Sequence, residues 1–374
     1  MKRLTVMAAG LGYRLLEENG LTAMAGLKFE PRESVFPAVT CVAQASLRTG
    51  QTPAGHGMVS NGWWSEDLRR PLFWEQSARL VKGERVWGRS TGVFFFQQSL
   101  GEDVELLISP APIHKHGGGM IMGCYTKPAG MTDVLVRLAG RFPLWRYWGP
   151  LASPKVGRKC VAYFEQMTNA HDVDEAYLYL PTLDYAAQRN GPNSPQARAA
   201  LKEFRRQLER LSELAMRRSC ELKVVGDYEI TEVTRAALQP NAVLRREGLF
   251  KTRSVGAMAY PDFYQSAAFA MCDHEFCVLC GEARDRAAET LLATGEYEDA
   301  SGEAGLPAGC RVLLAAAGSW CDYRWWTDAR EAPDFASHVD IHNKPGFDPR
   351  ELFFFCRGTV RGTHGRRCQV AASV

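Results

Sequence analysis

A threonine at the predicted start of a helix is the first residue of this chain whose type and position could support chemistry. Residues 41–49 have a helical pattern, which Thr40 opens and Gly50 closes. A hydroxyl at a helix start meets free backbone N–H groups and the positive end of the helix dipole, which favour an anion such as phosphate. Threonine is also a good N-cap, so local features alone favour a structural role for Thr40.

Two aspartates follow short apolar runs that are typical of buried strands. Residues 176–180 end at Pro181 and lead into the loop that holds Asp184, and residues 222–226 are followed directly by Asp227. Open α/β sheets bind ligands outside the carboxyl ends of their strands. We therefore expect Asp184 and Asp227 to lie at the ligand-binding edge of one sheet.

Two further histidines lie close to aspartates. His274 follows Asp273 within an apolar run, and His342 lies two positions after Asp340. Metal ligation and an ordinary structural role are equally good interpretations of both pairs. Three cysteines near His274 contain one C-x-x-C but no second pair at zinc-ribbon spacing, so we expect buried strand residues at Cys272, Cys277 and Cys280.

The elements that must position these residues alternate between strand-like and helix-like patterns. Residues 4–9 predict a first strand, and residues 195–217 predict the clearest helix, with Ser194 as its N-cap. Such alternation predicts an α/β fold with a largely parallel sheet and helices on both faces. We expect residues 1–240 and 336–374 to form the α/β core and residues 241–335 to form an inserted cap or accessory region.

Composition limits the partners. The 374 residues include 45 Lys+Arg against 42 Asp+Glu, a net charge of +3, which is too balanced for a dedicated nucleic-acid or anionic-membrane binder. No apolar run approaches the roughly 18 residues of a membrane span. Arg14 interrupts the first apolar segment too early for a signal peptide, and eleven scattered cysteines favour reduced thiols. We therefore predict a cytoplasmic protein with a small-molecule substrate.

Four segments in order resemble motifs of one known family. Residues 36–64, FPAVTCVAQASLRTGQTPAGHGMVSNGWW, resemble the nucleophile segment of type I phosphodiesterases and nucleotide pyrophosphatases, which belong to the alkaline phosphatase superfamily. LPTLDYAAQRNGP at 180–192, VVGDYEI at 224–230 and VRGTHG at 360–365 are similar to the family's later metal-binding segments. Only the first segment is specific by itself, and the others gain weight from their order.

The resemblance implies an alkaline-phosphatase-like fold and a metal-dependent hydrolase in which Thr40 is the nucleophile. Two divalent metals, usually zinc with manganese or iron as alternatives, would lower the pKa of the hydroxyl and offset charge on the phosphoryl oxygens. Carried over by position, Asp184 and His364 fall on one metal, and Thr40 and Asp227 fall on the other. His342 is a candidate third ligand for the first metal, and Asp273 or His274 are weaker candidates for the second.

Three positions depart from the family pattern. The first strand ends in Ala8 and Ala9 where the family has an aspartate, and Gln188 and Tyr228 stand where it has histidines. Zinc sites need three or four ligands, so we expect at most one tightly held metal.

The function that we predict is hydrolysis of phosphodiester or pyrophosphate bonds in a small phosphorylated substrate, with a nucleotide as one candidate. Two alternatives remain open. A degenerate member could bind a phosphate ligand without catalysis, and a phosphotransferase or phosphomutase could pass the phosphoryl group to an acceptor other than water.

Overall fold

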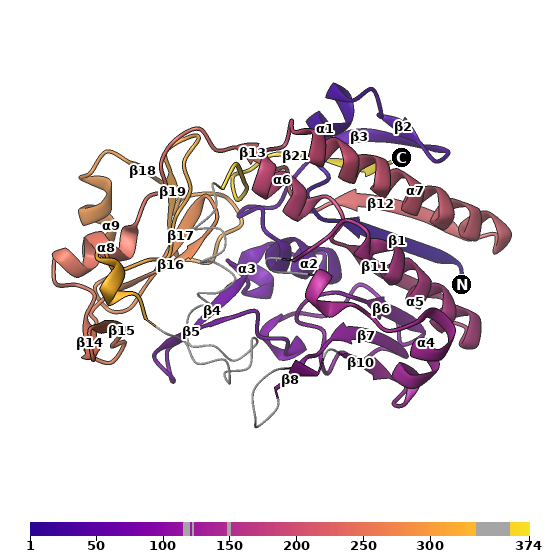
Figure 1. Cartoon of the computed structure of the whole chain (residues 1–374), viewed down its shortest axis with the longest axis horizontal. Coiled ribbons are helices and arrows are strands. Elements are labelled where there is room, and N and C mark those ends of the chain that lie inside the picture. Colours follow the sequence, from indigo (N-terminus) through magenta and orange to yellow (C-terminus); the bar gives the residue numbers. More distant parts are fainter. Residues whose placement is uncertain (115–119, 122, 148–150, 334–359) are drawn as a thin grey trace.

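The computed structural model describes residues 1–114, 120–121, 123–147, 151–333 and 360–374. A nine-stranded sheet runs through the larger part of the molecule (Figure 1). Its strands, in spatial order, are β10 (Cys124–Lys127), β7 (Leu106–Pro110), β6 (Thr91–Phe94), β11 (Glu175–Leu180), β1 (Arg3–Ala8), β12 (Glu221–Gly226), β21 (Gln369–Ser373), β3 (Leu27–Glu33) and β2 (Ala23–Met24).

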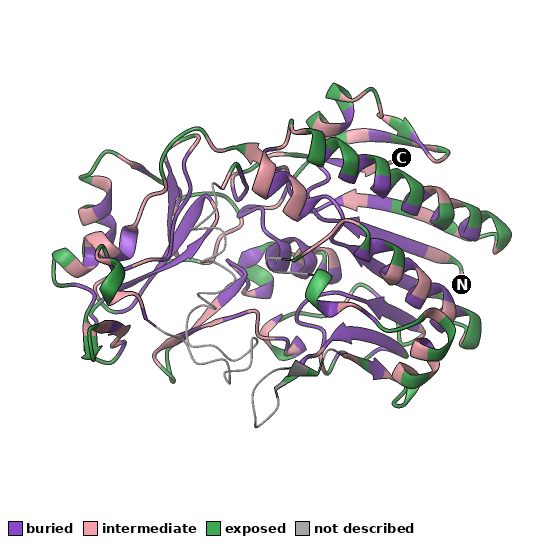
Figure 2. Cartoon of the chain, in the orientation of Figure 1, coloured by how far each residue is buried: buried purple, intermediate pink, exposed green. Residues whose placement is uncertain are grey.

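The five strands from β7 to β12 are parallel, and the strands at both edges are antiparallel. Every residue of β1 and β11 after the first is buried, and Figure 2 shows the centre of the sheet enclosed by other elements. Parallel strands covered on both faces read as continuous apolar runs, which is why β1 and β11 were recognisable in the sequence. The predicted α/β fold with a largely parallel sheet is confirmed.

Nine α-helices are found in the described residues. They are α1 (Tyr13–Glu18), α2 (Thr40–Thr49), α3 (Pro53–His56), α4 (Met131–Ala139), α5 (Val156–Ala170), α6 (Asp184–Asn190), α7 (Pro195–Arg217), α8 (Pro240–Arg246) and α9 (Arg284–Leu292). Helix α7 has the predicted bounds, and the Ser194 side chain accepts from the Ala197 N–H as predicted for an N-cap.

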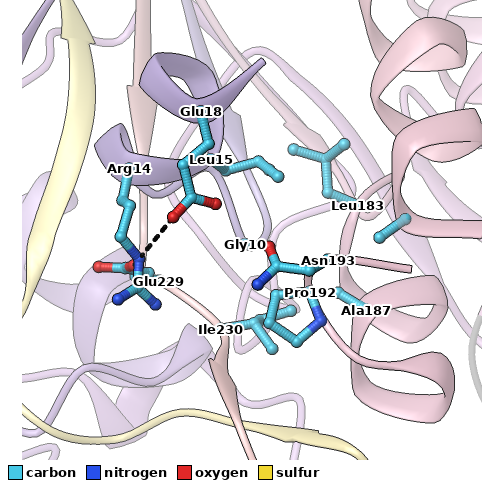
Figure 3. Close-up of a pocket in the computed structure, with 11 residues that line it drawn as sticks. Gly10, Arg14, Leu15, Glu18, Leu183, Ala187, Pro192, Asn193, Glu229 and Ile230 are labelled. Carbon is cyan, nitrogen blue, oxygen red and sulfur yellow. Dashed lines mark ion pairs between the residues drawn. The ribbon is translucent and has the colours of Figure 1, made fainter. Parts of the chain in front are cut away.

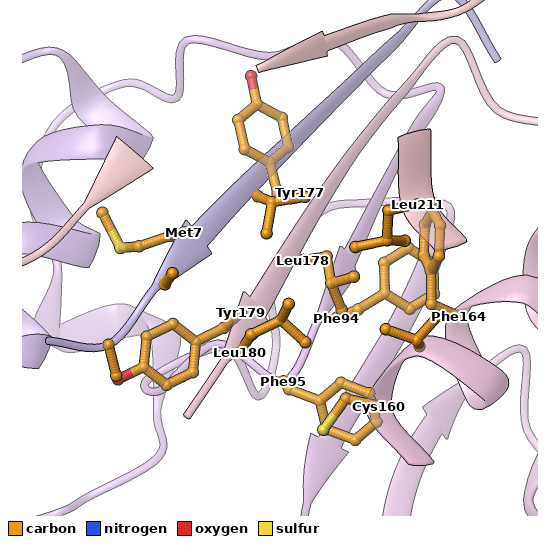
Figure 4. Packing of buried hydrophobic residues seen from close by; sticks show 14 of the residues in the cluster. Met7, Phe94, Phe95, Cys160, Phe164, Tyr177, Leu178, Tyr179, Leu180 and Leu211 are labelled. Carbon is orange, nitrogen blue, oxygen red and sulfur yellow. The ribbon is translucent and has the colours of Figure 1, made fainter. Parts of the chain in front are cut away.

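The core of the large sheet is built from aromatic and branched side chains of strands and helices. Phe94 of β6 meets Phe164 of α5 edge to face, with ring centroids 5.1 Å apart, and Leu211 of α7 joins them (Figure 4). Helices α5 and α7 contact each other and pack on β11 and β12. The apolar stripe of α7 therefore packs into the core, as its spacing predicts.

The region 241–335 is more regular than its sequence suggests. It holds a four-stranded antiparallel sheet in the order β16 (Phe269–Asp273), β17 (Phe276–Cys280), β19 (Arg311–Ala315) and β18 (Tyr297–Asp299). Cys272 lies in β16, Cys277 and Cys280 lie in β17, and all three are buried, so their predicted place is confirmed. Strands of three to five residues give too little periodicity to be recognised singly.

Smaller pairs of strands complete the described structure. They are β4 (Gly62–Ser65) with β5 (Arg70–Phe73), β8 (Ile113–His114) with β9 (Met120–Ile121), β13 (Thr231–Glu232) with β20 (Gly362–Thr363), and β14 (Thr252–Val255) with β15 (Met258–Pro261). None of the helices in the described part of the chain has the length and apolar character needed to cross a membrane. The strand suggested by residues 352–355 lies outside the described residues.

Buried apolar residues fall into two clusters. One surrounds the nine-stranded sheet, and the other surrounds the four-stranded sheet but also takes in Val39, Cys41, Val42 and Ala45 around α2. Ala43 of the same helix belongs to the first cluster. Helix α2 thus lies where the two cores meet, while the domain bounds given above stay a prediction.

His56 joins helix α3 to helix α2. The Met58 N–H donates to Nδ1 of His56 over 3.1 Å, so the proton of the neutral ring is on Nε2, which lies 2.9 Å from the Ser46 hydroxyl. The side chain is fully buried. Burial, with a smaller contribution from the charge of Arg48, lowers the pKa of His56 to about 4. The histidine of the GHG segment is therefore a structural, neutral group.

This histidine should make stability depend on pH. Unfolded His56 titrates near its ordinary pKa of 6.5, so its contribution is present above pH 6.5 and is lost as pH falls toward 4. We expect the free energy of unfolding to fall more steeply over that interval in the wild type than in His56→Asn, by up to about 1.4 kcal/mol per pH unit. Urea titrations at a series of pH values measure both slopes. Equal slopes would contradict the assignment.

Gly226, the last residue of β12, allows a close backbone approach. A Cβ at this position would lie 2.1 Å from the carbonyl oxygen of Leu11, in the loop after β1. We expect Gly226→Ala to lower the free energy of unfolding by about 3 kcal/mol, because the main chain must move. Gly88→Ala is the control, since a Cβ there meets nothing within 4 Å. Thermal and urea unfolding of both variants should separate them, and equal stabilities would show that the loop yields freely.

Candidate active site

Thr40 is the first residue of α2, and it is buried at 6% exposure. The prediction that it serves as the N-cap is wrong. Val39 holds the N-cap position with an extended backbone, and the Asn61 side chain, from another segment, accepts from the Cys41 N–H over 3.0 Å. The Thr40 side chain instead lies beside the hydroxyl groups of Tyr179 and Tyr228.

These two tyrosines connect Thr40 to the two predicted aspartates. The Tyr228 hydroxyl donates to Oδ1 of Asp184 over 3.0 Å, and the Tyr179 hydroxyl donates to Oδ2 of Asp227 over 3.3 Å. Tyr179 is in β11, next to the last residue of that strand, while Asp227 and Tyr228 directly follow β12. Both carboxylates therefore lie at the carboxyl edge of the parallel strands, where the sequence predicts them.

Backbone and amide groups complete the hydrogen bonding of the carboxylates. Oδ1 of Asp227 accepts from the N–H groups of Gly10 and Tyr228, each over 2.9 Å. Oδ1 of Asp184 also accepts from the Gln188 amide over 2.5 Å, one helical turn along α6. The Gly10 N–H thus reaches the aspartate from the end of β1, where Ala8 and Ala9 supply no carboxylate of their own.

Burial dominates the electrostatics of this cluster. It raises the pKa of Asp184, against the hydrogen bonds from Gln188 and Tyr228, and it raises the pKa of Asp227 well above its ordinary value. The pKa values of Tyr179 and Tyr228 are also raised by burial and then by the nearby carboxylates. Both phenols are therefore neutral hydrogen-bond donors at neutral pH.

His364 and His274 stack with Tyr228 in one row. The rings of His364 and Tyr228 are parallel within 4°, and their centroids are 3.7 Å apart. The centroid of the His274 ring is also 3.7 Å from that of His364. Nδ1 of His364 is 3.1 Å from the carbonyl oxygen of Ala38, two residues before Thr40. Burial, then the charge of His274, lowers the pKa of His364 well below its ordinary value.

The structure thus brings together most residues singled out in the sequence. Hydrogen bonds and ring contacts link Asp184, Asp227, His364 and His274 to the two tyrosines, which lie beside Thr40. Asp273 lies beside this group, but its carboxylate accepts three hydrogen bonds from Ser60 and Asn61. His342 lies outside the described residues. The catalytic and metal-binding roles assigned to these positions stay predictions.

A separate pocket lies behind the cluster, lined by parts of residues 10–18, 183–197 and 229–230 (Figure 3). Gly10 and Leu183 border it, next to the groups that hold Asp227 and Asp184. Ion pairs of Arg14 with Glu229 at 2.8 Å and with Glu18 at 3.8 Å cross one side of it. The Thr40 side chain is not part of its lining.

The family of this chain follows from the comparison with known families. Residues 7–348 match the model of type I phosphodiesterases/nucleotide pyrophosphatases, and the chain belongs to that family, within the alkaline phosphatase superfamily. The resemblance seen in the sequence is confirmed. A comparison with curated proteins finds no match.

Solved structures support the fold. Phosphonoacetate hydrolase from Sinorhizobium meliloti, in complex with phosphonoformate, is similar with a TM-score of 0.64 and 14% identity, over 100% of this chain and 89% of that chain. The mouse ectonucleotide pyrophosphatase/phosphodiesterase 5 gives 0.57 and 14%, over 100% and 88%. The human protein of the same name gives 0.55 and 13%, over 99% and 87%. At such identity the likeness shows an alkaline-phosphatase-like fold.

Members of this family use divalent metals, but the described residues of this chain do not fit a two-metal site. No three His, Cys, Asp or Glu side chains among them are grouped so as to hold a metal ion. The oxygens of Asp227 already accept from three donors, and Tyr228 offers a phenol where a histidine would ligate. The metal assignments made from the resemblance, including the choice of zinc, therefore stay untested.

Two residues of the cluster were missed in the sequence. Tyr179 is one of several large side chains in a buried strand, and nothing in its spacing separates it from a core residue. Asn61 follows the GHG segment by four positions and caps α2 only because the chain folds back. The resemblance identifies Tyr228 only as a residue that stands where the family has a histidine, yet in the structure it contacts Asp184 and His364 and lies beside Thr40.

The hydrogen bond from Tyr228 to Asp184 should stabilise the fold. In Tyr228→Phe the ring can still stack on His364, but the buried carboxylate loses a donor. We expect the free energy of unfolding to fall by about 1–2 kcal/mol. Tyr125→Phe, at an exposed position, should change it by less than about 0.5 kcal/mol. Urea unfolding measures both variants, and a Tyr228→Phe protein as stable as the control would contradict this role.

Proposed function

We propose that this chain hydrolyses a phosphodiester or pyrophosphate bond in a small phosphorylated ligand, and that Thr40 is the attacking group. The carrying observation is the buried contact of Thr40 with two phenols that each donate to a carboxylate. A hydroxyl in such a network has a path for its proton. The family supports hydrolysis, and a mouse relative has been solved in complex with AMP, which makes a nucleotide one candidate ligand.

Different residues of the cluster would carry out different steps of this reaction. The positive end of the α2 dipole favours the phosphoryl group beside Thr40. As the Thr40 oxygen attacks phosphorus, its proton moves to the Tyr228 oxygen, and the phenol proton moves to Asp184. The bond from phosphorus to the leaving oxygen breaks, and that oxygen takes a proton from water. Water then hydrolyses the phosphothreonine, and the carboxylate returns its proton through the same phenol.

A second candidate, a phosphate-binding protein without catalysis, is favoured by a different observation. Both aspartates are already hydrogen-bonded inside the protein, and the described residues hold no group of three metal ligands. A protein that lacks catalysis would still offer an anion site at the start of α2. Binding of inorganic phosphate without turnover would favour this candidate.

The decisive experiment is turnover of a generic aryl phosphodiester and of a dinucleoside pyrophosphate by the purified chain. The assay is run as purified, after dialysis against a chelator, and with excess zinc or manganese, alongside elemental analysis of each sample. An acceptor alcohol tests whether the phosphoryl group passes to water alone. Absence of turnover in all samples would refute the proposal.

Replacing Thr40 tests the nucleophile. We expect Thr40→Ala to lose turnover by at least about 10³-fold, because no other hydroxyl can form the phosphothreonine. Thr40→Ser should retain measurable turnover and a trapped phosphoserine detectable by mass spectrometry. Thr40→Ala also removes a buried hydroxyl beside two phenols, so we expect a modest fall in melting temperature, and circular dichroism checks that the variant is folded at the assay temperature. Turnover by the alanine variant near the wild-type rate would remove Thr40 from the mechanism.

A further inference from the structure

We propose that His274, at the tip of the β16–β17 hairpin, contacts the phosphoryl group of the ligand bound beside Thr40. The four-stranded sheet would then supply part of the binding site that the nine-stranded sheet begins. This inference rests on the function proposed above and names a binding residue for it.

The backbone of His274 is unusual for its residue type. The hairpin pairs Asp273 with Phe276, so His274 and Glu275 form a two-residue connection. His274 has φ of +58°, in the left-handed region that favours glycine and asparagine at such connections. Residues held in this region persist only where their surroundings hold them, and they cluster at functional sites.

Both neighbours of His274 are held by other segments. The Asp273 carboxylate accepts from the Ser60 hydroxyl, the Asn61 N–H and the Asn61 amide over 2.6–3.0 Å. On the other side, Oε1 of Glu275 accepts from the Thr231 hydroxyl over 2.5 Å. Asn61 is also the residue that caps α2, so its hydrogen bonds join the hairpin tip directly to the helix that Thr40 begins.

The main chain of the tip is held as well. The Glu275 N–H donates to the carbonyl oxygen of His364 over 2.9 Å, and the His274 carbonyl accepts from the Cys321 N–H over 2.6 Å. The Arg366 N–H donates to Oε2 of Glu275 over 3.3 Å. Three consecutive residues are thus fixed to neighbouring segments, and the His274 ring lies 3.7 Å from that of His364.

Exposure distinguishes His274 from the rest of the cluster. His274 is half-buried, whereas Thr40, Asp184 and His364 are buried. Of the cluster residues that the structure describes, His274 is the one that solvent reaches most readily. The imidazole is therefore the group of this cluster that is most open to a ligand from solvent. A ring N–H is a hydrogen-bond donor to phosphate, and the ring stacked behind it keeps it in place.

The test compares two replacements that the backbone tolerates. His274→Asn and His274→Gly both suit a positive φ, so relief of backbone strain should offset much of the lost ring contact with His364, and both variants should stay folded at the assay temperature. We expect both to weaken binding of inorganic phosphate at least about tenfold, measured by calorimetry, and to raise KM for the aryl phosphodiester similarly. His171→Asn, at the end of α5, is the control and should match the wild type.

The outcomes separate this inference from the proposed function. If the wild type binds phosphate and both variants bind it within about twofold of the wild type, His274 is not a ligand contact and the inference fails. If both variants lose stability but keep their phosphate affinity, the histidine only packs on His364, and the inference fails again. A wild type that neither binds phosphate nor turns over the diester overturns the proposed function and this inference together.

Discussion

The candidate site depends on how two carboxylates are stabilised without water at one edge of the sheet. Asp184 and Asp227 are buried, and an unpaired buried charge would cost more than the fold can spare. Their oxygens accept from the phenols of Tyr228 and Tyr179, from the Gly10 N–H and from other nearby donors. The loop after β1 must therefore pass close to β12. The hydrogen bonds to these two carboxylates hold the ends of three neighbouring strands together.

Helix α2 and the β16–β17 hairpin are tied to the same edge. Asn61 accepts from the first turn of α2 and donates to Asp273 of the hairpin, so one side chain joins both. The row of Tyr228, His364 and His274 then packs the hairpin tip against the cluster. Since Ala43 and Val42 of α2 belong to different cores, neither sheet can shift without moving Thr40.

Family membership and site chemistry give different kinds of information here. The chain retains the fold of the type I phosphodiesterases at about one identical residue in seven relative to the solved structures. A fold survives such change because it requires apolar patterns and strand order, whereas a metal site requires particular side chains. The end of β1 and Tyr228 do not offer the metal ligands that the resemblance implies. At both positions the structure has hydrogen bonds to Asp227 or Asp184 instead. Family membership therefore suggests a phosphoester hydrolase without specifying which side chains would carry out the reaction.

The sequence by itself determined the elements that carry a strong local signal. These elements are the apolar runs of β1, β11 and β12, the capped helix α7 and the individual family segments. Each consists of neighbouring residues, so each can be read directly from the sequence. The strands, the helix and the family were confirmed. Of the shorter strands, β16 and β17 were expected around Cys272, Cys277 and Cys280, whereas β6, β7 and β18 were missed, because a few residues carry no period and depend on partners far away in the chain.

The site divides in the same way. Asp184 and Asp227 could be placed at strand ends from the sequence, because parallel strands bring their carboxyl ends to one edge. Only the tertiary structure decided what surrounds them. That Tyr179 and Tyr228 bond the carboxylates, that Asn61 and not Thr40 caps α2, and that His274 reaches the cluster are contacts between residues distant in sequence. Such contacts leave no spacing in the chain, because they form only when the fold brings distant segments together.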